Sequence, residues 1–149
     1  MSQKLRTQVK TKRPTTAGLQ REFYLIDAST APIGRIATEA ARLLMGKNKA
    51  NYSPDVNMGA VVVITNASKS VLTGKKPDKK NYFRYSGYMG GMHVRSFKEQ
   101  MAKDPTYPLM HAIKGMLPKN RHQDIRAHQL LHIFEGDHNL PNKMITVTL

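Results

Sequence analysis

Basic and aromatic side chains alternate along residues 75–95, the part of the sequence best suited to binding a partner molecule. Lysine and arginine neutralise phosphates, aromatic rings offer faces for bases or riboses, and glycines let the backbone approach closely. The alternative is a solvated loop whose rings turn to the core, with Phe83 the best candidate for burial. We favour contact with nucleic acid, through Lys75, Lys76, Lys79, Lys80, Tyr82, Arg84, Tyr85, Ser86, Gly87, Tyr88, Gly90, Gly91 and Arg95.

The glycine motifs of nucleotide-binding enzymes are incomplete here. LTGKK contains the Gly-Lys pair of a phosphate-binding loop. That loop needs serine or threonine after the pair, but Lys76 and Pro77 follow here. GYMGG lacks the GxGxxG spacing and does not follow a buried strand. The sequence therefore predicts no small-molecule substrate and no dinucleotide cofactor.

Histidines and carboxylates do not assemble a catalytic or metal site either. HQLLH resembles the zinc-protease helix motif, but Gln129 replaces the glutamate that acts as general base. The segment also passes from an expected helix into an expected strand. Asp27 ends an expected strand and is a better turn residue than a catalytic acid. The chain has no cysteine, which excludes thiolate metal sites. Taken together, these patterns lead us to expect no enzyme, no metal and no cofactor.

The charge of the chain points to a polyanionic partner. Its 149 residues carry 24 lysines and arginines against 10 acidic residues, a formal net charge of +14. Nucleic acid suits this excess, because neutralising phosphates releases condensed counterions. A membrane is a weaker candidate, since no apolar run is long enough to span a bilayer. The length predicts one domain.

Residues 1–22 contain a basic stretch that we expect to be an arm. An organellar transit peptide has similar composition, but Pro14 and Gly18 interrupt any amphipathic helix, so we favour an arm that threads between phosphates. No apolar segment of the secretory type accompanies it. The arm residues expected to bind RNA are Lys10, Lys12 and Arg13.

Residues 23–149 make up the remaining sequence, and the first half of this range predicts an α/β unit. FYLID is typical of a strand, and residues 31–46 place apolar side chains at helical spacing, with Ser29 and Thr30 as capping residues and Gly46 as the end. Residues 60–66 form a continuous apolar run, which indicates a strand buried on both faces. Strand, helix and buried strand together predict a mostly parallel central sheet flanked by helices.

The second half predicts short elements. From Lys69 we expect a short strand and then a long exposed basic loop, followed by helices in residues 95–104, 105–117 and 121–130. LLHIF predicts a last strand, and the tail after Gly136 is expected to be irregular. Further cations expected to contact phosphates lie at helix ends and turns, where some also compensate helix dipoles; with Asn120 they are Lys47, Lys49, Lys69, Lys114, Lys119 and Arg121.

Four stretches resemble one known family in order and spacing: LIDASTAPIGRIATEAARLLMGK, NYSPDVNMGAVVVITNASK, TGKKPDKKNYFRYSGYMGG and AIKGMLPKN. They are similar to the bacterial large-subunit ribosomal protein L13 (uL13) family, and AIKGMLPKN is the most specific of them. The chain departs from the family pattern at Phe23, where tryptophan is common, and at Ala60, where aspartate is common. A His-Pro-His turn is replaced by residues 138–140, His-Asn-Leu.

The resemblance implies a compact α/β domain that is a structural constituent of the large (50S) ribosomal subunit. It implies binding to large-subunit (23S-type) ribosomal RNA, neighbouring large-subunit ribosomal proteins as partners, a role in early subunit assembly, and a cytoplasmic, ribosome-bound location. The rival class is a nuclease or phosphotransferase. Such an enzyme needs clustered carboxylates for magnesium, and this chain lacks them. A free regulatory RNA-binding module remains open, because it would have the same surface chemistry.

Overall fold

A four-stranded parallel sheet forms the centre of the protein, in a computed structural model that describes residues 14–15, 19–137 and 144–149. The strand order is β5-β2-β1-β6, from β1 (Phe23–Asp27), β2 (Val61–Thr65), β5 (Leu131–Ile133) and β6 (Ile145–Val147). All three pairings are parallel, as the sequence predicted. Every residue of β2 is buried, which confirms its interior position.

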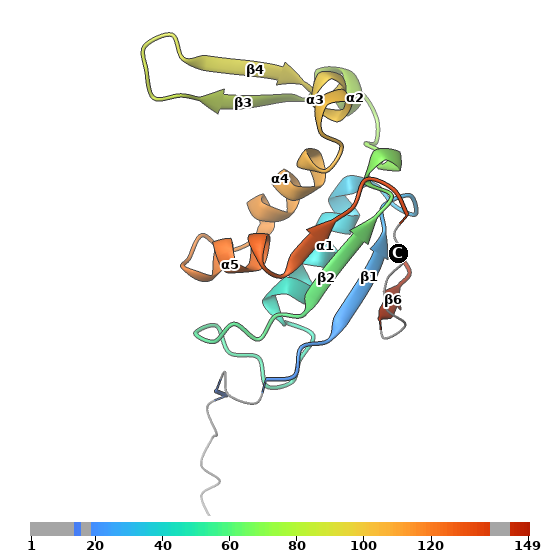
Figure 1. The fold of residues 1–149 in the computed structure, drawn as a ribbon, viewed down its shortest axis with the longest axis vertical. Coiled ribbons are helices and arrows are strands. Elements are labelled where there is room, and N and C mark those ends of the chain that lie inside the picture. Colours follow the sequence, from blue (N-terminus) through green and yellow to red (C-terminus); the bar gives the residue numbers. More distant parts are fainter. Residues whose placement is uncertain (1–13, 16–18, 138–143) are drawn as a thin grey trace, which may run out of the picture.

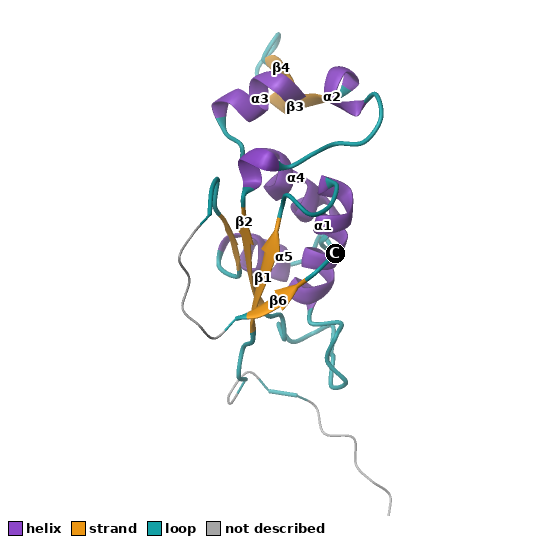
Figure 2. Ribbon diagram, turned by 90° about the vertical axis from the view of Figure 1, so that its right-hand side faces the viewer, coloured by secondary structure: helices purple, strands orange, loops and turns teal. Residues whose placement is uncertain are grey.

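Helix α1 (Ile33–Met45) lies against one face of this sheet (Figure 2). Its buried side chains recur at helical spacing, among them Ile36, Ala40 and Leu43. Gly46 ends the helix, as predicted, and has a φ of 77° in the left-handed region. Helix α4 (Tyr107–Met116) packs against α1, so the two helices form a second layer behind the sheet (Figure 1).

The predicted side-chain cap of α1 is wrong. Pro32 occupies the cap position, and the carbonyl of Val71 accepts the hydrogen bond from the Ile33 N–H at 3.0 Å. Ser29 and Thr30 instead form a turn on Asp27, whose carboxylate accepts the Ser29 N–H at 2.9 Å. This hydrogen bond, helped by one from Asn66, lowers the pKa of Asp27, so the group is ionised near neutral pH. Asp27 is a turn residue, as expected.

Two further expectations need correction. The region after Lys69 is not a long loop. It follows the 3-10 helix η1 (Ala67–Lys69) and contains α2 (Lys76–Lys79) and an antiparallel hairpin of β3 (Asn81–Tyr85) and β4 (Met92–Ser96). The tail is not wholly irregular, because β6 pairs with β1 at the sheet edge. The hydroxyl-bearing and β-branched residues of the tail suit an edge strand.

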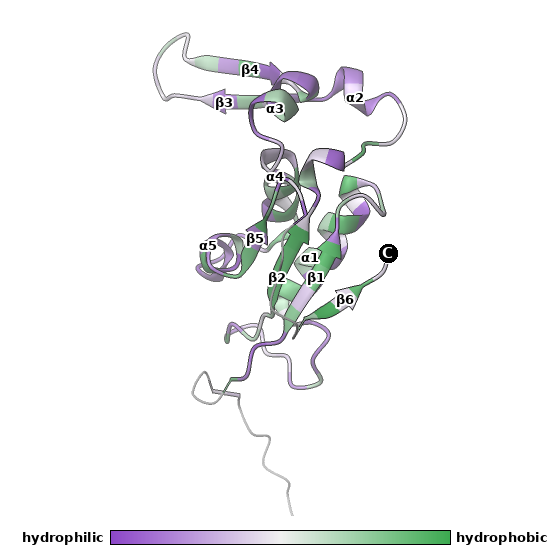
Figure 3. Ribbon diagram, turned by 45° about the vertical axis from the view of Figure 1, so that its right-hand side comes forward, coloured by the Kyte–Doolittle hydropathy of each residue, from purple (hydrophilic) through white to green (hydrophobic). Residues whose placement is uncertain are grey.

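Three helices follow the hairpin, as predicted: α3 (Phe97–Lys103), α4 and α5 (His122–His128). Ser96 and Glu99 form a reciprocal capping box that starts α3 directly at the end of β4. Figure 3 shows hydrophobic residues gathered on the strands of the central sheet, whereas α2 is hydrophilic. No helix in the described part of the chain is both long and apolar enough to cross a membrane.

One buried charge stands out beside this core. The Arg126 side chain is only 1% exposed, and its Nε donates to the Asn57 amide oxygen at 3.3 Å. Its Nη2 has no hydrogen-bond partner among the described residues. Burial lowers the pKa of Arg126, which shows that the charged form is disfavoured there.

We therefore predict that Arg126→Met is at least as stable as the wild type. Replacing a buried, poorly compensated charge with an apolar side chain of similar volume is often neutral or stabilising by about 1 to 4 kcal/mol. Asn57→Ala should destabilise by about 1.5 to 3 kcal/mol, because it removes the amide acceptor of a charged group. Denaturant unfolding of both single variants and the double variant measures this. Equal costs of Asn57→Ala with and without Arg126 would contradict it.

Candidate nucleic-acid interface

The β3–β4 hairpin projects from one end of the molecule and has two chemically different faces (Figure 1). Paired residues of an antiparallel ladder share a face, and successive residues alternate. One face carries the pairs Tyr82 with Arg95 and Arg84 with His93. The other carries Phe83 with Val94 and Tyr85 with Met92, whose side chains are 65%, 49%, 66% and 61% exposed. The hairpin is thus cationic on one face and apolar on the other.

The hairpin tip, residues 86–91, explains the glycines of this segment. Gly87 and Gly90 have φ of 94° and 71°, a conformation that disfavours other residues. A Cβ on Gly91 would lie 2.9 Å from the backbone carbonyl oxygen of Tyr88, so this position also favours glycine. The turn leaves Tyr88 80% exposed to solvent. The glycines therefore have structural causes, whether or not a phosphate approaches them.

The prediction that the Tyr82 ring is exposed for binding is wrong. Its side chain is 7% exposed and meets Tyr107 and His111 of α4 edge-on, at centroid distances of 5.5 and 5.4 Å. The Lys80 ammonium lies 5.3 Å from the ring centroid. Burial, and secondarily the neighbouring Tyr107, raises the pKa of Tyr82, so its phenol stays neutral. Tyr82 fixes the hairpin to α4. The alternative in which Phe83 turns to the core is also wrong, because Phe83 is exposed.

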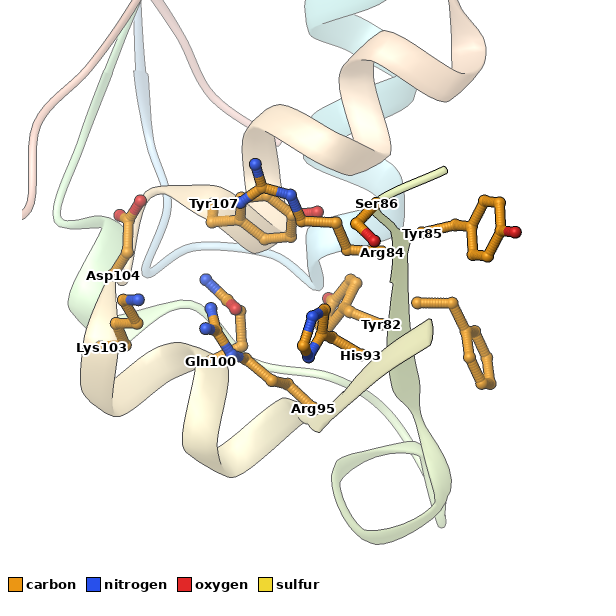
Figure 4. A pocket seen from close by; sticks show the side chains of 11 residues that line it. Tyr82, Arg84, Tyr85, Ser86, His93, Arg95, Gln100, Lys103, Asp104 and Tyr107 are labelled. Atoms are coloured by element: carbon orange, nitrogen blue, oxygen red, sulfur yellow. The ribbon is translucent and has the colours of Figure 1, made fainter. Parts of the chain in front are cut away.

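A cleft of about 680 Å³ opens between the cationic face of the hairpin and helices α3 and α4. Arg84, His93 and Arg95 line it from the hairpin (Figure 4). Gln100, Lys103 and Tyr107 line it from the helices, while the Tyr85 ring points away (Figure 4). The one acidic lining residue, Asp104, uses its carboxylate to accept hydrogen bonds from the backbone and hydroxyl of Thr106, at 2.9 and 2.7 Å.

Six lining residues of this cleft were not in the predicted set of site residues: Phe83, His93, Gln100, Lys103, Asp104 and Tyr107. A signal for His93 was available, because Tyr82, Arg84, His93 and Arg95 fit the two-residue alternation of a hairpin. The helix residues carried no such signal, since their approach to the hairpin depends on how α3 and α4 pack.

Lysines beside the hairpin remain open to solvent. Lys75, Lys76, Lys79 and Lys80 all have exposed side chains, on or next to α2. Asp78 of the same helix pairs with Lys98 of α3 at 2.7 Å. Lys69 is exposed in η1. The structure therefore gathers the predicted cations of residues 75–95 around the hairpin, without bringing them all into the cleft.

A second hollow, of about 590 Å³, lies at residues 111–123. Lys119, Asn120 and Arg121 line it with exposed side chains, together with Lys114 and Gly115 of α4. Lys114 pairs with Asp124 at 3.1 Å, so it is partly neutralised. The Asn120 amide oxygen accepts the His122 N–H at 3.2 Å and shapes the turn into α5.

The remaining predicted residues lie elsewhere. Lys47 and Lys49 follow α1 at the end of the molecule opposite the hairpin, and Lys47 is the more exposed of the two (Figure 1). Lys10, Lys12 and Arg13 fall outside the described residues, as do residues 138–140. His128 ends α5 and His132 lies in β5, so HQLLH does not form one helix face. Within the described ranges, no three histidine, aspartate or glutamate side chains group as metal ligands.

The different placements of Tyr82 and Tyr85 give a testable contrast. Tyr82→Ala should destabilise the protein by about 3 kcal/mol or more, because it empties a buried aromatic site. Tyr85→Ala should change the free energy of unfolding by less than about 0.5 kcal/mol, since its ring is in solvent. Thermal or denaturant unfolding measures both. Similar values for the two variants would contradict the burial of Tyr82.

Comparison with known proteins identifies the family of the chain. The profile described as Ribosomal protein L13 matches residues 21–139. The chain is 47% identical to "Large ribosomal subunit protein uL13" of Roseiflexus sp. over 113 residues, 76% of this chain and 77% of the relative. It is 44% identical to the protein of that name from Clostridioides difficile over 120 residues, 80% and 83% of the two chains. The chain belongs to the ribosomal protein L13 family.

Proposed function

We propose that this protein is a structural component of the large ribosomal subunit and binds large-subunit ribosomal RNA through three basic regions. The regions are the N-terminal arm, the hairpin with its neighbouring lysines, and the corner at residues 111–121. The family is structural and non-enzymatic, and its curated relatives are named as large-subunit proteins. The protein would act in early assembly on cytoplasmic ribosomes, beside neighbouring ribosomal proteins.

The observation that carries this proposal is the presence of two basic hollows on one rigid support. Tyr107, in the first turn of α4, lines the cleft. Lys114 and Gly115, in its last turn, line the second hollow. Between the two hollows, the buried residues Leu109 and Ile113 hold α4 in the core. Two cationic surfaces at a fixed separation favour one arrangement of the RNA segments that they contact, so recognition rests on RNA shape.

The apolar face of the hairpin adds a different kind of contact. Phe83 and Tyr85 expose their rings beside the arginines of the opposite face. Exposed rings next to cations suit stacking on unpaired bases, which occurs in single-stranded loops and bulges of RNA. We therefore assign the hairpin to an irregular part of the RNA.

We predict that RNA affinity falls steeply with salt and that lysines near α2 set part of the slope. Each neutralised phosphate contributes about 0.7 to 0.9 to the slope of log K against log salt. Replacing Lys75, Lys76 and Lys79 together with glutamine should lower the slope by about two to three units. Filter binding of large-subunit RNA across a salt series measures it, with Arg35→Gln on α1 as the control. A slope near zero in the wild type would refute the electrostatic proposal.

Gly115 provides a second test, because a Cβ there would meet no protein atom within 4 Å. Gly115→Ala should stabilise the helix by about 0.5 to 1 kcal/mol. If RNA backbone contacts this side of α4, the added methyl should cost about 1 to 3 kcal/mol of binding, or roughly fivefold or more in affinity. Unfolding and RNA binding are measured on the same variant.

Gly34→Ala is the matched control for Gly115→Ala. Gly34 also lies in a helix, α1, and also has open space around its Cβ position. It should gain stability without losing affinity. If Gly115→Ala binds RNA as tightly as the wild type, the corner of residues 111–121 is not part of the RNA interface.

A further inference from the structure

We propose that the cleft between the hairpin and helices α3 and α4 holds a single unpaired nucleotide of the bound RNA. This inference rests on the proposed function and deepens it, because it assigns one site within the interface to a nucleotide with its base extruded from the stack.

The shape of the cleft suits an inserted ligand. A phosphate contact needs only an exposed lysine, as at residues 75–80, whereas the cleft encloses about 680 Å³ between two walls. That volume falls in the range in which proteins bind small ligands. The hairpin forms one wall and the helices the other (Figure 4). A paired base inside a duplex cannot enter such a space, but an unpaired nucleotide can.

The cations around the cleft outnumber its one acidic residue, Asp104. Arg84, Arg95 and Lys103 form no ion pair with any described carboxylate. Acidic residues elsewhere do pair with cations: Asp78 with Lys98, and Asp124 with Lys114. Asp104, the acidic residue of the cleft, is already engaged by Thr106. The cleft therefore presents net positive charge suited to the phosphate of a nucleotide.

Gln100 distinguishes a nucleotide from a simple anion. Its side chain belongs to the buried part of α3, at 5% exposure, and lines the cleft facing the hairpin (Figure 4). The amide forms no hydrogen bond with any described residue and is not among the fully buried polar atoms, so a ligand in the cleft can reach it. An amide both donates and accepts, as base edges do, whereas a phosphate only accepts. The exposed His93 ring is available for stacking on the base.

The test uses the full chain bound to large-subunit ribosomal RNA. Base-specific chemical probing should show at least one unpaired nucleotide that the wild type protects. Gln100→Met keeps the side-chain volume but removes both hydrogen-bonding groups; it should restore reactivity there and weaken binding about 3- to 10-fold. Gln129→Met makes the same change at the exposed residue that follows α5 and should leave both unchanged.

Charge variants separate the cleft from the rest of the interface. Arg84→Gln with Arg95→Gln should lower affinity and remove the protection of that nucleotide. Lys75→Gln with Lys76→Gln removes the same charge outside the cleft; it should lower affinity and keep the protection. Gln100→Glu, which retains the size of the side chain but repels a phosphate, should weaken binding more than Gln100→Met. It serves as the second variant if Gln100→Met unfolds.

The outcomes distinguish this inference from the proposed function. If the wild type binds large-subunit RNA no better than unrelated RNA, the proposed function fails. If binding is specific but Gln100→Met, folded as the wild type, leaves the probing pattern unchanged, only the nucleotide site fails. If a glutamate-rich peptide competes for the cleft and the RNA does not, the cleft belongs to an acidic protein segment and the inference is overturned.

Discussion

The packing of α4 against α1 is the contact on which both basic surfaces depend. Leu109 and Ile113 of α4 are fully buried, and α1 presents the small side chains of Ala37 and Ala40 in the same core. Small residues let two helices approach closely, so α4 has little freedom to shift. A helix of ten residues is about 15 Å long. That length sets the distance between the cleft at one end of α4 and the hollow at the other.

The hairpin needs this support more than any other element. A two-stranded ribbon is marginally stable alone, and one face of this ribbon is exposed and apolar. Tyr82 packs on α4 at its base, and the capping box of Ser96 and Glu99 joins β4 directly to α3. The base is therefore held, while the tip extends into solvent (Figure 1). Such a shape lets a small domain present side chains beyond its own core.

Sequence reasoning succeeded where one local pattern determined the structure. Residues 60–66 are apolar without a break, and α1 has apolar residues at helical spacing, so strand, helix and parallel pairing could all be predicted. The hairpin was missed because lysines, tyrosines and glycines hide its alternation. The burial of Tyr82 depends on Tyr107 and His111, residues that follow it by more than twenty positions and approach only in the fold. The cleft required the same tertiary contacts.

The distribution of acidic residues links stability to binding. With only 10 carboxylates for 24 cations, local pairs such as Asp124 with Lys114 cannot balance the chain. Most cations therefore repel one another in the free protein, and salt screens that repulsion. Salt also weakens the attraction of the same cations to phosphates. Added salt should thus stabilise the free fold while loosening a complex with RNA. In the proposed complex, RNA would supply the counter-charge that the carboxylates do not, and would stabilise the fold by binding it.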